Sequence, residues 1–84
     1  MTQADEIRAF VNATYIAPAR TAGTRRVQVR AGTVHAQMKL RDRMPAVASA
    51  LGATTFETTY RVRCVERQGP HNGANLTFTF ELLP

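Results

Sequence analysis

Residues 29–51 read VRAGTVHAQMKLRDRMPAVASAL, and their apolar spacing predicts two short helices separated by a charged turn. The first of these helices spans about ten residues from Ala31. Pro45 suits the first turn of the second helix, where its missing N–H would have no partner within the helix. Three basic residues stand immediately before that second helix: Lys39, Arg41 and Arg43. The fold predicted for the rest of the chain must be consistent with this pair of helices.

An amphipathic helix is predicted at the N-terminal end. Thr2 and Asp5 have the spacing of a capping box, and apolar residues then recur on one helical face from Ile7 to Tyr15. Pro18 cannot continue a regular helix, so we expect this helix to end near Ile16. Its apolar stripe could be buried in the core of this chain or shared in a dimer, and the sequence leaves both open.

Three strands are predicted from period-two alternation. Residues 25–30, RRVQVR, alternate arginine or glutamine with valine, and residues 76–83, LTFTFELL, alternate apolar residues with Thr and Glu. In residues 61–68, RVRCVERQ, one predicted face holds Val62 and Cys64, and the other holds Arg61, Arg63 and Arg67. The turn residues of GPHNGAN join the last two strands in a hairpin with a long tip. Residues 54–60, TTFETTY, are expected to be a short helical or irregular piece that contributes Phe56 to the core.

The length and composition indicate a single domain over residues 1–84 in the ordinary globular range. No apolar run approaches the roughly 20 residues that a membrane span needs, and the first residues lack the apolar core of a signal peptide. The lone cysteine, Cys64, excludes an internal disulfide and a cysteine-based zinc site. These features favour a cytoplasmic protein without membrane contact.

The positive charge is concentrated in one part of the chain. Residues 20–43 hold seven basic residues and one acidic residue, a net charge of +6, whereas the whole chain carries +5. Ten of the eleven basic residues are arginine, the side chain suited to paired contacts with phosphate or guanine. A GC-rich coding bias would also favour arginine over lysine, but it would not explain the clustering. The clustering favours an anionic partner.

The predicted element order, α-β-α-α-β-wing-β, resembles that of prokaryotic winged helix-turn-helix domains. The resemblance covers nearly the whole chain in element order and is tightest over residues 29–51 and 69–80. The segments RAGTVH, RMPAV and GANLTFTF are also similar, more distantly, to small domains encoded beside restriction and defence genes. The resemblance implies an α+β fold with three helices packed on a small antiparallel sheet.

In domains of this family the third helix enters the DNA major groove and the hairpin, or wing, reaches the phosphates or the minor groove. The resemblance therefore implies a recognition helix at about residues 44–51, a wing at about 68–75, and double-stranded DNA as the partner of a monomer or homodimer. Such a protein would be a transcription regulator, a defence-system module or a nucleoid-associated protein. The residues expected to contact nucleic acid are Lys39, Arg41, Arg43, Ala46, Ser49, Ala50, Arg67, Gln68, His71, Asn72 and Asn75.

The predicted recognition helix has few groups that read base edges. If Met44, Val47 and Leu51 face the core, the exposed side chains are those of Arg43, Ala46, Ser49 and Ala50. Only Arg43 among them makes paired hydrogen bonds to a base. We therefore expect phosphate contacts to dominate the affinity and the sequence preference to be modest.

Two other interpretations of the basic residues remain open. Residues 39–43 could be a solvated helix start. Further arginines could project from the sheet face opposite the helices, where they would bind an acidic protein, extend the electrostatic footprint around DNA, or pair with Glu66 and Glu81. This secondary basic face comprises Arg25, Arg26, Arg30, Arg61 and Arg63.

An enzymatic role is not expected. The two histidines, His35 and His71, have neither metal-ligand spacing nor a neighbouring carboxylate, and no nucleophile motif or phosphate-binding glycine loop is present. Cys64 alternates with Val62 on an apolar strand face, as a small buried side chain would. The sequence therefore predicts no catalytic residue, metal or cofactor.

Overall fold

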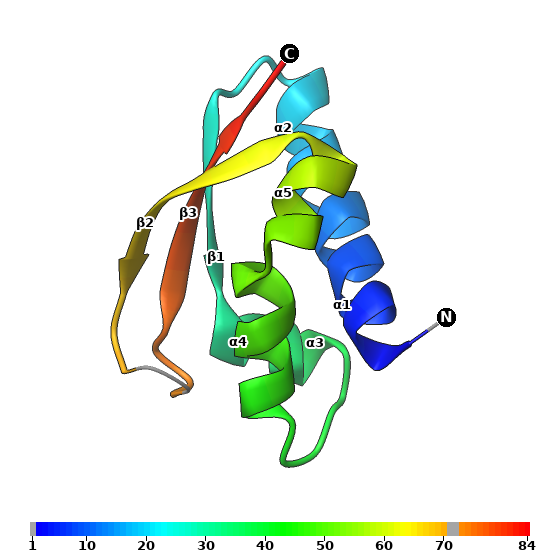
Figure 1. Cartoon of the computed structure of the whole chain (residues 1–84), viewed down its shortest axis with the longest axis vertical. Helices are drawn as coiled ribbons and strands as arrows, with labels where there is room; N and C mark the ends of the chain where they lie inside the picture. Colours follow the sequence, from blue (N-terminus) through cyan, green and yellow to red (C-terminus); the bar gives the residue numbers. More distant parts are fainter. Residues whose placement is uncertain (1, 71–72) are drawn as a thin grey trace.

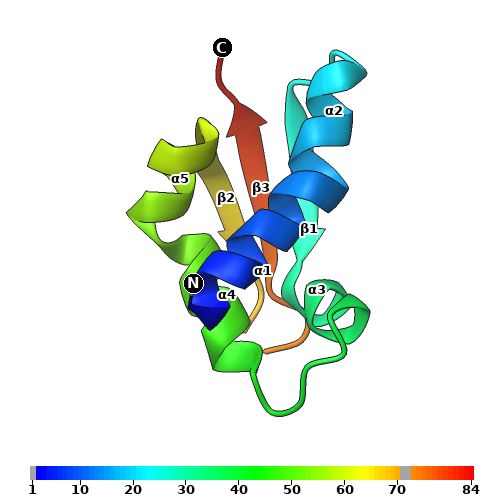
Figure 2. The ribbon, with the colours of Figure 1, turned by 90° about the vertical axis from the view of Figure 1, so that its right-hand side faces the viewer.

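The computed structural model describes residues 2–70 and 73–84, with helices packed on one face of a three-stranded antiparallel sheet (Figures 1 and 2). The predicted α+β class is confirmed. The elements are α1 (Gln3–Val11), the π-helix η1 (Asn12–Ile16), α2 (Ala17–Thr21), β1 (Arg26–Arg30), α3 (Ala31–Gln37), α4 (Met44–Gly52), α5 (Thr54–Tyr60), β2 (Val62–Gln68) and β3 (Thr77–Leu82).

The predicted capping box begins the first helix. The Thr2 hydroxyl accepts a hydrogen bond from the Asp5 N–H at 3.1 Å, and the Asp5 carboxylate accepts one from the Thr2 N–H at 3.2 Å. Ile7, Val11 and Ile16 are fully buried. Most of the apolar stripe of this helix therefore lies in the core of this chain, with Phe10 and Tyr15 only partly buried at its margin.

The prediction that the helix ends near Ile16 is wrong, because α1, η1 and α2 follow one another without a break to Thr21. In a regular α-helix the Pro18 ring would clash with the carbonyl four residues earlier. Here the N–H of Ala17 donates to the carbonyl of Asn12, five residues back, so the helix widens to a π turn just before the proline. Pro18 then lies in the first turn of α2, where a missing N–H is tolerated.

The two predicted central helices are present with different lengths. α3 has seven residues where about ten were expected, whereas α4 matches the predicted recognition helix closely. Residues 54–60 form a regular helix, α5, which buries Phe56. The observed order thus contains a helix between α4 and β2 that the predicted order lacked.

The three strands have the predicted faces over most of their length. β3 lies between β1 and β2, and the pairs Val27–Phe80 and Val29–Phe78 point toward the helices. The Phe56 ring packs edge-on against Phe80 with centroids 5.0 Å apart. The core therefore fills the space between the helical layer and one face of the sheet, and the other face is solvent-exposed.

The predicted sheet face of Arg67 in β2 is wrong. A β-bulge between Cys64 and Glu66 shifts the register, so that Arg67 pairs with Phe78, whose side chain points into the core. Because the extra residue reverses the alternation, Arg67 lies on the helix side of the sheet and not beside Arg63 on the outer face.

Candidate nucleic-acid interface

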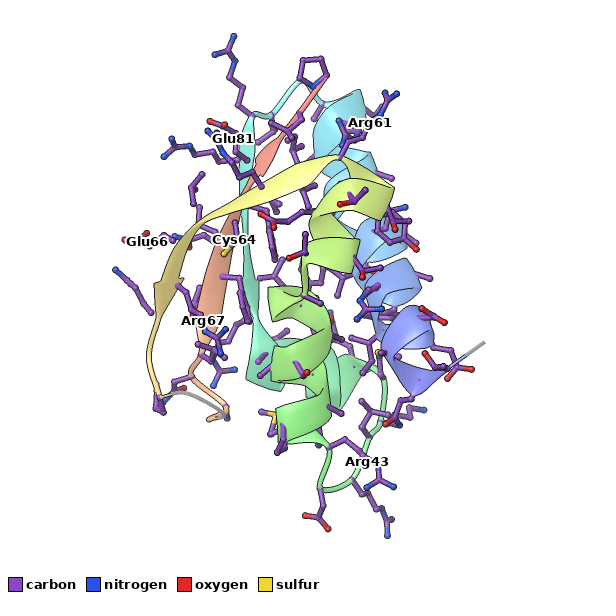
Figure 3. The ribbon with its side chains drawn as sticks, in the orientation of Figure 1. Arg43, Arg61, Cys64, Glu66, Arg67 and Glu81 are labelled. Carbon is purple, nitrogen blue, oxygen red and sulfur yellow. The ribbon has the colours of Figure 1, made fainter. Side chains whose placement is uncertain are left out.

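The loop between α3 and α4 carries the three basic side chains that the sequence singled out. Lys39, Arg41 and Arg43 are all exposed, and Figure 3 shows Arg43 at one end of the molecule, directed away from the core. Leu40 anchors the middle of the loop, because its side chain is half-buried against the core and its N–H donates to the His35 carbonyl at 3.0 Å. The backbone that carries the three basic side chains is therefore anchored to the core through Leu40.

The backbone of this loop has left-handed residues at two positions other than glycine. Lys39 has φ 56° and Asp42 has φ 51°. Lys39 lies just after α3, where a left-handed residue commonly reverses the chain and allows the last helical carbonyls to be capped. Its N–H donates to the carbonyl of Ala36 at 3.0 Å. These conformations let six residues connect two helices that pack against each other.

His35 holds the start of α4. Arg43 is the N-cap residue of α4 and makes no side-chain capping bond, but its main-chain N–H donates to Nε2 of His35 at 3.2 Å. The acceptor nitrogen must be unprotonated, so the proton of the neutral ring is on Nδ1. His35 thus fixes the loop from the C-terminal part of α3. No local pattern predicts this contact, because eight residues separate the partners.

Fewer side chains of α4 are exposed to solvent than the sequence predicts. Ser49 is exposed as the helical spacing predicts, whereas Ala46, which was also expected to be exposed, is half-buried against the core. Ala50 was expected to be exposed, but it is 1% exposed. α1 covers it, and the Arg8 guanidinium of α1 donates to the Ala50 carbonyl at 3.0 Å. Ala50 therefore cannot contact DNA without a rearrangement of the fold.

Arg67 occupies the space between the sheet and α4, as Figure 3 shows. Its guanidinium carbon lies 5.0 Å from the centroid of the Phe78 ring, a cation–π distance. A Cβ at Gly52 would stand 3.0 Å from Nη1 of Arg67, so the arginine passes close to the end of α4. Arg67 is thus exposed but contacts both the Phe78 ring and the end of α4.

The other predicted wing residues have partners of their own or lie outside the described residues. Gln68 donates to the Glu66 carboxylate at 2.9 Å, and Asn75 accepts from Nη2 of Arg30 at 2.8 Å. His71 and Asn72 are outside the described residues. Asn75 therefore joins the end of the hairpin to the end of β1.

The connection between β2 and β3 also caps α3. The N–H of Ala31 donates to the Leu76 carbonyl at 2.8 Å, and the N–H of Gly32 donates to the Ala74 carbonyl at 3.0 Å. A Cβ at Gly32 would stand 2.6 Å from the Ala74 carbonyl oxygen, closer than real contacts allow. The glycine thus permits the close approach of the hairpin to the helix pair that carries the basic loop.

The basic residues that cluster in the sequence do not form one cluster in space. β1 runs along the long axis of the molecule, so that α2, which contains Arg20, and the loop before α4, which contains Arg43, lie at opposite ends (Figure 1). Arg20 donates to the carbonyls of Tyr60 at 2.7 Å, Arg61 at 2.8 Å and Leu83 at 2.6 Å. Only the C-terminal part of the +6 segment is therefore available at the loop.

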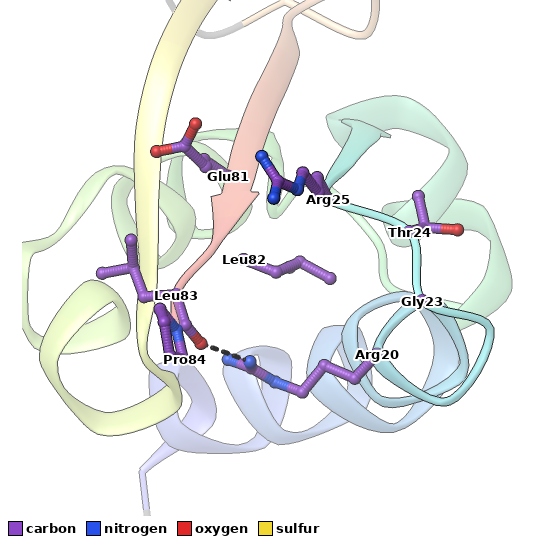
Figure 4. A pocket seen from close by; sticks show the side chains of 8 residues that line it. All are labelled: Arg20, Gly23, Thr24, Arg25, Glu81, Leu82, Leu83 and Pro84. Atoms are coloured by element: carbon purple, nitrogen blue, oxygen red, sulfur yellow. Dashed lines mark hydrogen bonds between the residues drawn. The ribbon is translucent and has the colours of Figure 1, made fainter.

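Arg20 lies beside an open pocket of about 520 Å³ at the end of the molecule opposite the loop (Figure 4). The pocket is bounded by the turn after α2 and by the end of β3, and Figure 4 shows Arg25 and Glu81 on the same side of it. The Arg20 bonds close one wall by joining α2 to Leu83, directly after β3, and to the turn between α5 and β2. Arg20 is thus a structural residue.

The outer face of the sheet is charged but partly self-compensated. Glu81 of β3 lies 2.7 Å from Arg63 of β2 and 3.7 Å from Arg26 of β1. The predicted cross-strand pairing is thus confirmed for Glu81, whereas Glu66 bonds Gln68 instead. Arg61 lies in the left-handed turn between α5 and β2, with φ 56°, and not within the strand.

Cys64 is half-buried beside the core, and desolvation raises the pKa of its thiol. Among residues 2–70 and 73–84, no group of three or more His, Cys, Asp or Glu side chains is placed to hold a metal ion. None of the helices in this part of the chain is long and apolar enough to cross a membrane.

Comparisons with protein-family models, curated proteins and solved structures find no match for this chain. The geometry of the loop, α4 and the hairpin is therefore the basis of the proposed function.

Proposed function

We propose that this protein binds double-stranded DNA as a winged-helix domain, with α4 as the recognition helix and the β2–β3 hairpin as the wing. The observation that carries the proposal is the loop 39–43. It holds three exposed basic side chains on an anchored backbone directly before the N-terminus of α4, where free N–H groups add partial positive charge. In Figure 1 this loop and the described ends of the hairpin connection lie at the same end of the molecule.

The chemistry of α4 argues for contacts to phosphate more than to bases. Its nine residues, MPAVASALG, contain no charged or amide side chain, and Ser49 is its exposed hydrogen-bonding side chain. Small side chains allow close approach to the duplex but supply few directional bonds. The protein would therefore bind many sequences with similar affinity, as a nucleoid-associated protein, a module of a defence system or a regulator that gains specificity from a dimer. We also propose that the protein is located in the cytoplasm of a prokaryote.

The test is a fluorescence-anisotropy titration of labelled duplex DNA across a salt series. We expect binding in the micromolar range or tighter, with log affinity falling against log salt with a slope of about three to six, as a few phosphate contacts predict. The double variant Arg41→Ala and Arg43→Ala should weaken binding and reduce the slope by about two.

Arg63→Ala is the control for each of the single substitutions Arg41→Ala and Arg43→Ala, since it also removes one positive charge, from the outer sheet face, while Glu81 keeps Arg26 as a neighbour. It should leave DNA binding nearly unchanged. The absence of detectable binding at about 50 mM salt would refute the proposal, because phosphate contacts are strongest at low salt.

An acidic protein that binds the outer sheet face is the alternative. The side chains of Arg26 and Arg63 are 63% and 61% exposed there, so they could reach a partner. This function predicts that the loop variants retain binding and that substitutions at Arg61 or Arg63 lose it. Glu81 already neutralises part of this charge, which is why we favour the loop.

A further inference from the structure

β1 is an edge strand, and its hydrogen-bonding groups alternate between β3 and the open side. The flanking bonds set the alternation: the N–H of Leu82 donates to the Arg25 carbonyl at 2.8 Å, and the N–H of Ala31 donates to the Leu76 carbonyl at 2.8 Å. Residues with odd numbers in β1 are therefore the hydrogen-bonded partners of β3. The intervening residues direct their main-chain groups to the outer edge.

The open groups are the N–H and C=O of Arg26 and Gln28, together with the N–H of Arg30. Among the described residues, no hydrogen bond is made by these N–H groups. Figure 2 shows β1 at the margin of the fold, with α2 and α3 beyond its two ends. A five-residue stretch of sheet edge is thus available to a further strand.

The opposite edge of the sheet is protected. On β2 the Cys64 N–H, which points away from β3, donates to the Glu57 carboxylate of α5 at 2.9 Å. The bulge at Val65 interrupts the same edge one residue later. Since natural sheets usually cover or distort their edges, the contrast between the two edges of this sheet needs an explanation.

The side chains on the open edge carry positive charge that the fold compensates only in part. Arg26 and Arg30 flank Gln28 on the outer face, and β1 contains no acidic residue. Glu81 is nearer to Arg63 than to Arg26, and Arg30 donates only to the neutral groups of Thr33 and Asn75. An incoming strand therefore meets a positive potential.

Pairing with a second copy of the chain is disfavoured by this charge. A twofold antiparallel β1–β1 contact centred on Gln28 would place Arg26 directly opposite Arg30 of the second copy. Like charges in directly opposed positions destabilise a strand pair. A strand with carboxylates at alternate positions would instead place glutamate or aspartate beside both arginines.

We propose that the β1 edge binds an extended acidic segment of a partner protein as a fourth strand of the sheet. The main-chain groups of Arg26 and Gln28 supply the hydrogen bonds, and the Arg26 and Arg30 guanidinium groups select carboxylates. This site lies on the edge of the sheet, apart from the loop 39–43, and does not depend on DNA binding.

The probe is the acetylated heptapeptide Thr-Glu-Val-Glu-Val-Glu-Thr, titrated into the ¹⁵N-labelled full chain at about 150 mM salt, where surface charge alone is screened. We expect chemical-shift changes centred on residues 26–30 and at least about tenfold slower hydrogen exchange at the Arg26 and Gln28 amides, because a new strand would cover them. The same peptide with lysine in place of glutamate should produce neither effect.

Gln28→Pro is the decisive variant. It removes an outward N–H and no bond to β3, so an edge strand should tolerate it. It should abolish peptide binding, whereas Gln28→Ala, which keeps the N–H, should retain it. If Gln28→Pro fails to fold, the double variant Arg26→Glu and Arg30→Glu serves instead, and it should reverse the preference toward the lysine peptide.

Three results would overturn the proposal. One is the absence of any shift at millimolar peptide. Another is a set of shifts that include Arg63 or residues 39–43 without slower exchange at Arg26 and Gln28, since that pattern indicates nonspecific charge attraction. The last is competition between duplex DNA and the peptide for the β1 amides, which would make the edge part of a nucleic-acid interface.

Discussion

The imidazole Nε2 of His35 and the main-chain N–H of Arg43 lie 3.2 Å apart and form a hydrogen bond that links the end of α3 to the start of α4. Arg43 has no side-chain capping bond, but this contact satisfies the N–H of the N-cap residue itself, as the N3 side chain does in a capping box. The residue proposed to contact DNA is thus positioned by a histidine that faces the protein.

His35→Ala should loosen the loop without removing any basic side chain. We expect a loss of about 0.5–1.5 kcal/mol in the free energy of unfolding, the usual contribution of one hydrogen bond. Hydrogen exchange at the Arg43 amide should accelerate, and DNA affinity should fall although the charge of the loop is unchanged. Urea denaturation and amide exchange measure the first two effects. An Arg43 amide that exchanges at the wild-type rate in His35→Ala would contradict the assigned role.

Arg20 should prove to be a stabilising residue and not a DNA contact. Its guanidinium donates to three carbonyls in two segments, so Arg20→Ala should cost about 1–2 kcal/mol, which includes a discount for solvent exposure. Arg20→Lys should recover only part of this, because an ammonium group lacks the planar fork of donors. Thermal melting tests the ranking of the three proteins. DNA affinity measured well below the melting temperature should be nearly equal in all of them.

The stability contributed by Asp5 should depend on pH. Hydrogen bonds from the main-chain N–H and the hydroxyl of Thr2 lower the pKa of Asp5, and the charge of Arg8 acts in the same direction. The folded pKa lies below the unfolded one, so the stabilisation is complete above the ordinary value of 3.8 and is lost as pH falls through the folded pKa. The difference in stability between wild type and Asp5→Ala should therefore be constant near neutrality and shrink below about pH 4. A difference that grows on acidification would contradict this sign.

Cys64 should react slowly with thiol reagents. Desolvation raises the pKa of this thiol, which keeps it protonated near neutral pH. The raised pKa also means that its contribution to stability is present below the ordinary value of 9.0 and is lost as pH rises through the folded pKa. Reaction with an aromatic disulfide reagent at pH 8 should be much slower in the native protein than in urea. Equal rates in the two conditions would show that the thiol is not shielded.

Local periodicity was sufficient to predict the three strands and three of the segments that form helices, but it left residues 54–60 open between a helix and an irregular piece. Alternation in residues 26–30 and 77–82 reports which side chains meet the core, and the observed pairs Val29–Phe78 and Val27–Phe80 follow from it. The features that were mispredicted depend on partners distant in the chain or on changes in register. The bulge that turns Arg67 inward adds one residue to the pairing without changing the composition of the strand.

Several features of the candidate site also depend on contacts between residues that are distant in the chain. Exposure of Lys39, Arg41 and Arg43 follows from local charge, but burial of Ala50 depends on the position of α1, and the involvement of Arg20 depends on the last strand. The net charge of residues 20–43 is therefore larger than the charge that the loop presents. Only the fold separates the arginines that tie segments together from those that face solvent.

Gly32 should be indispensable for the position of the hairpin. A Cβ there would stand 2.6 Å from the Ala74 carbonyl oxygen, and main-chain atoms cannot move aside as a flexible side chain can. Although alanine is the better helix former, we expect Gly32→Ala to destabilise the protein by about 1–3 kcal/mol, the usual cost of overpacking. Chemical-shift changes should extend from α3 to residues 74–76, because the hairpin must move away from the helix. Ala36→Ser, at an exposed position in the same helix, is the control and should cost no more than about 0.5 kcal/mol. A Gly32→Ala variant as stable as wild type, with unshifted hairpin resonances, would show that the hairpin does not pack against α3 as described.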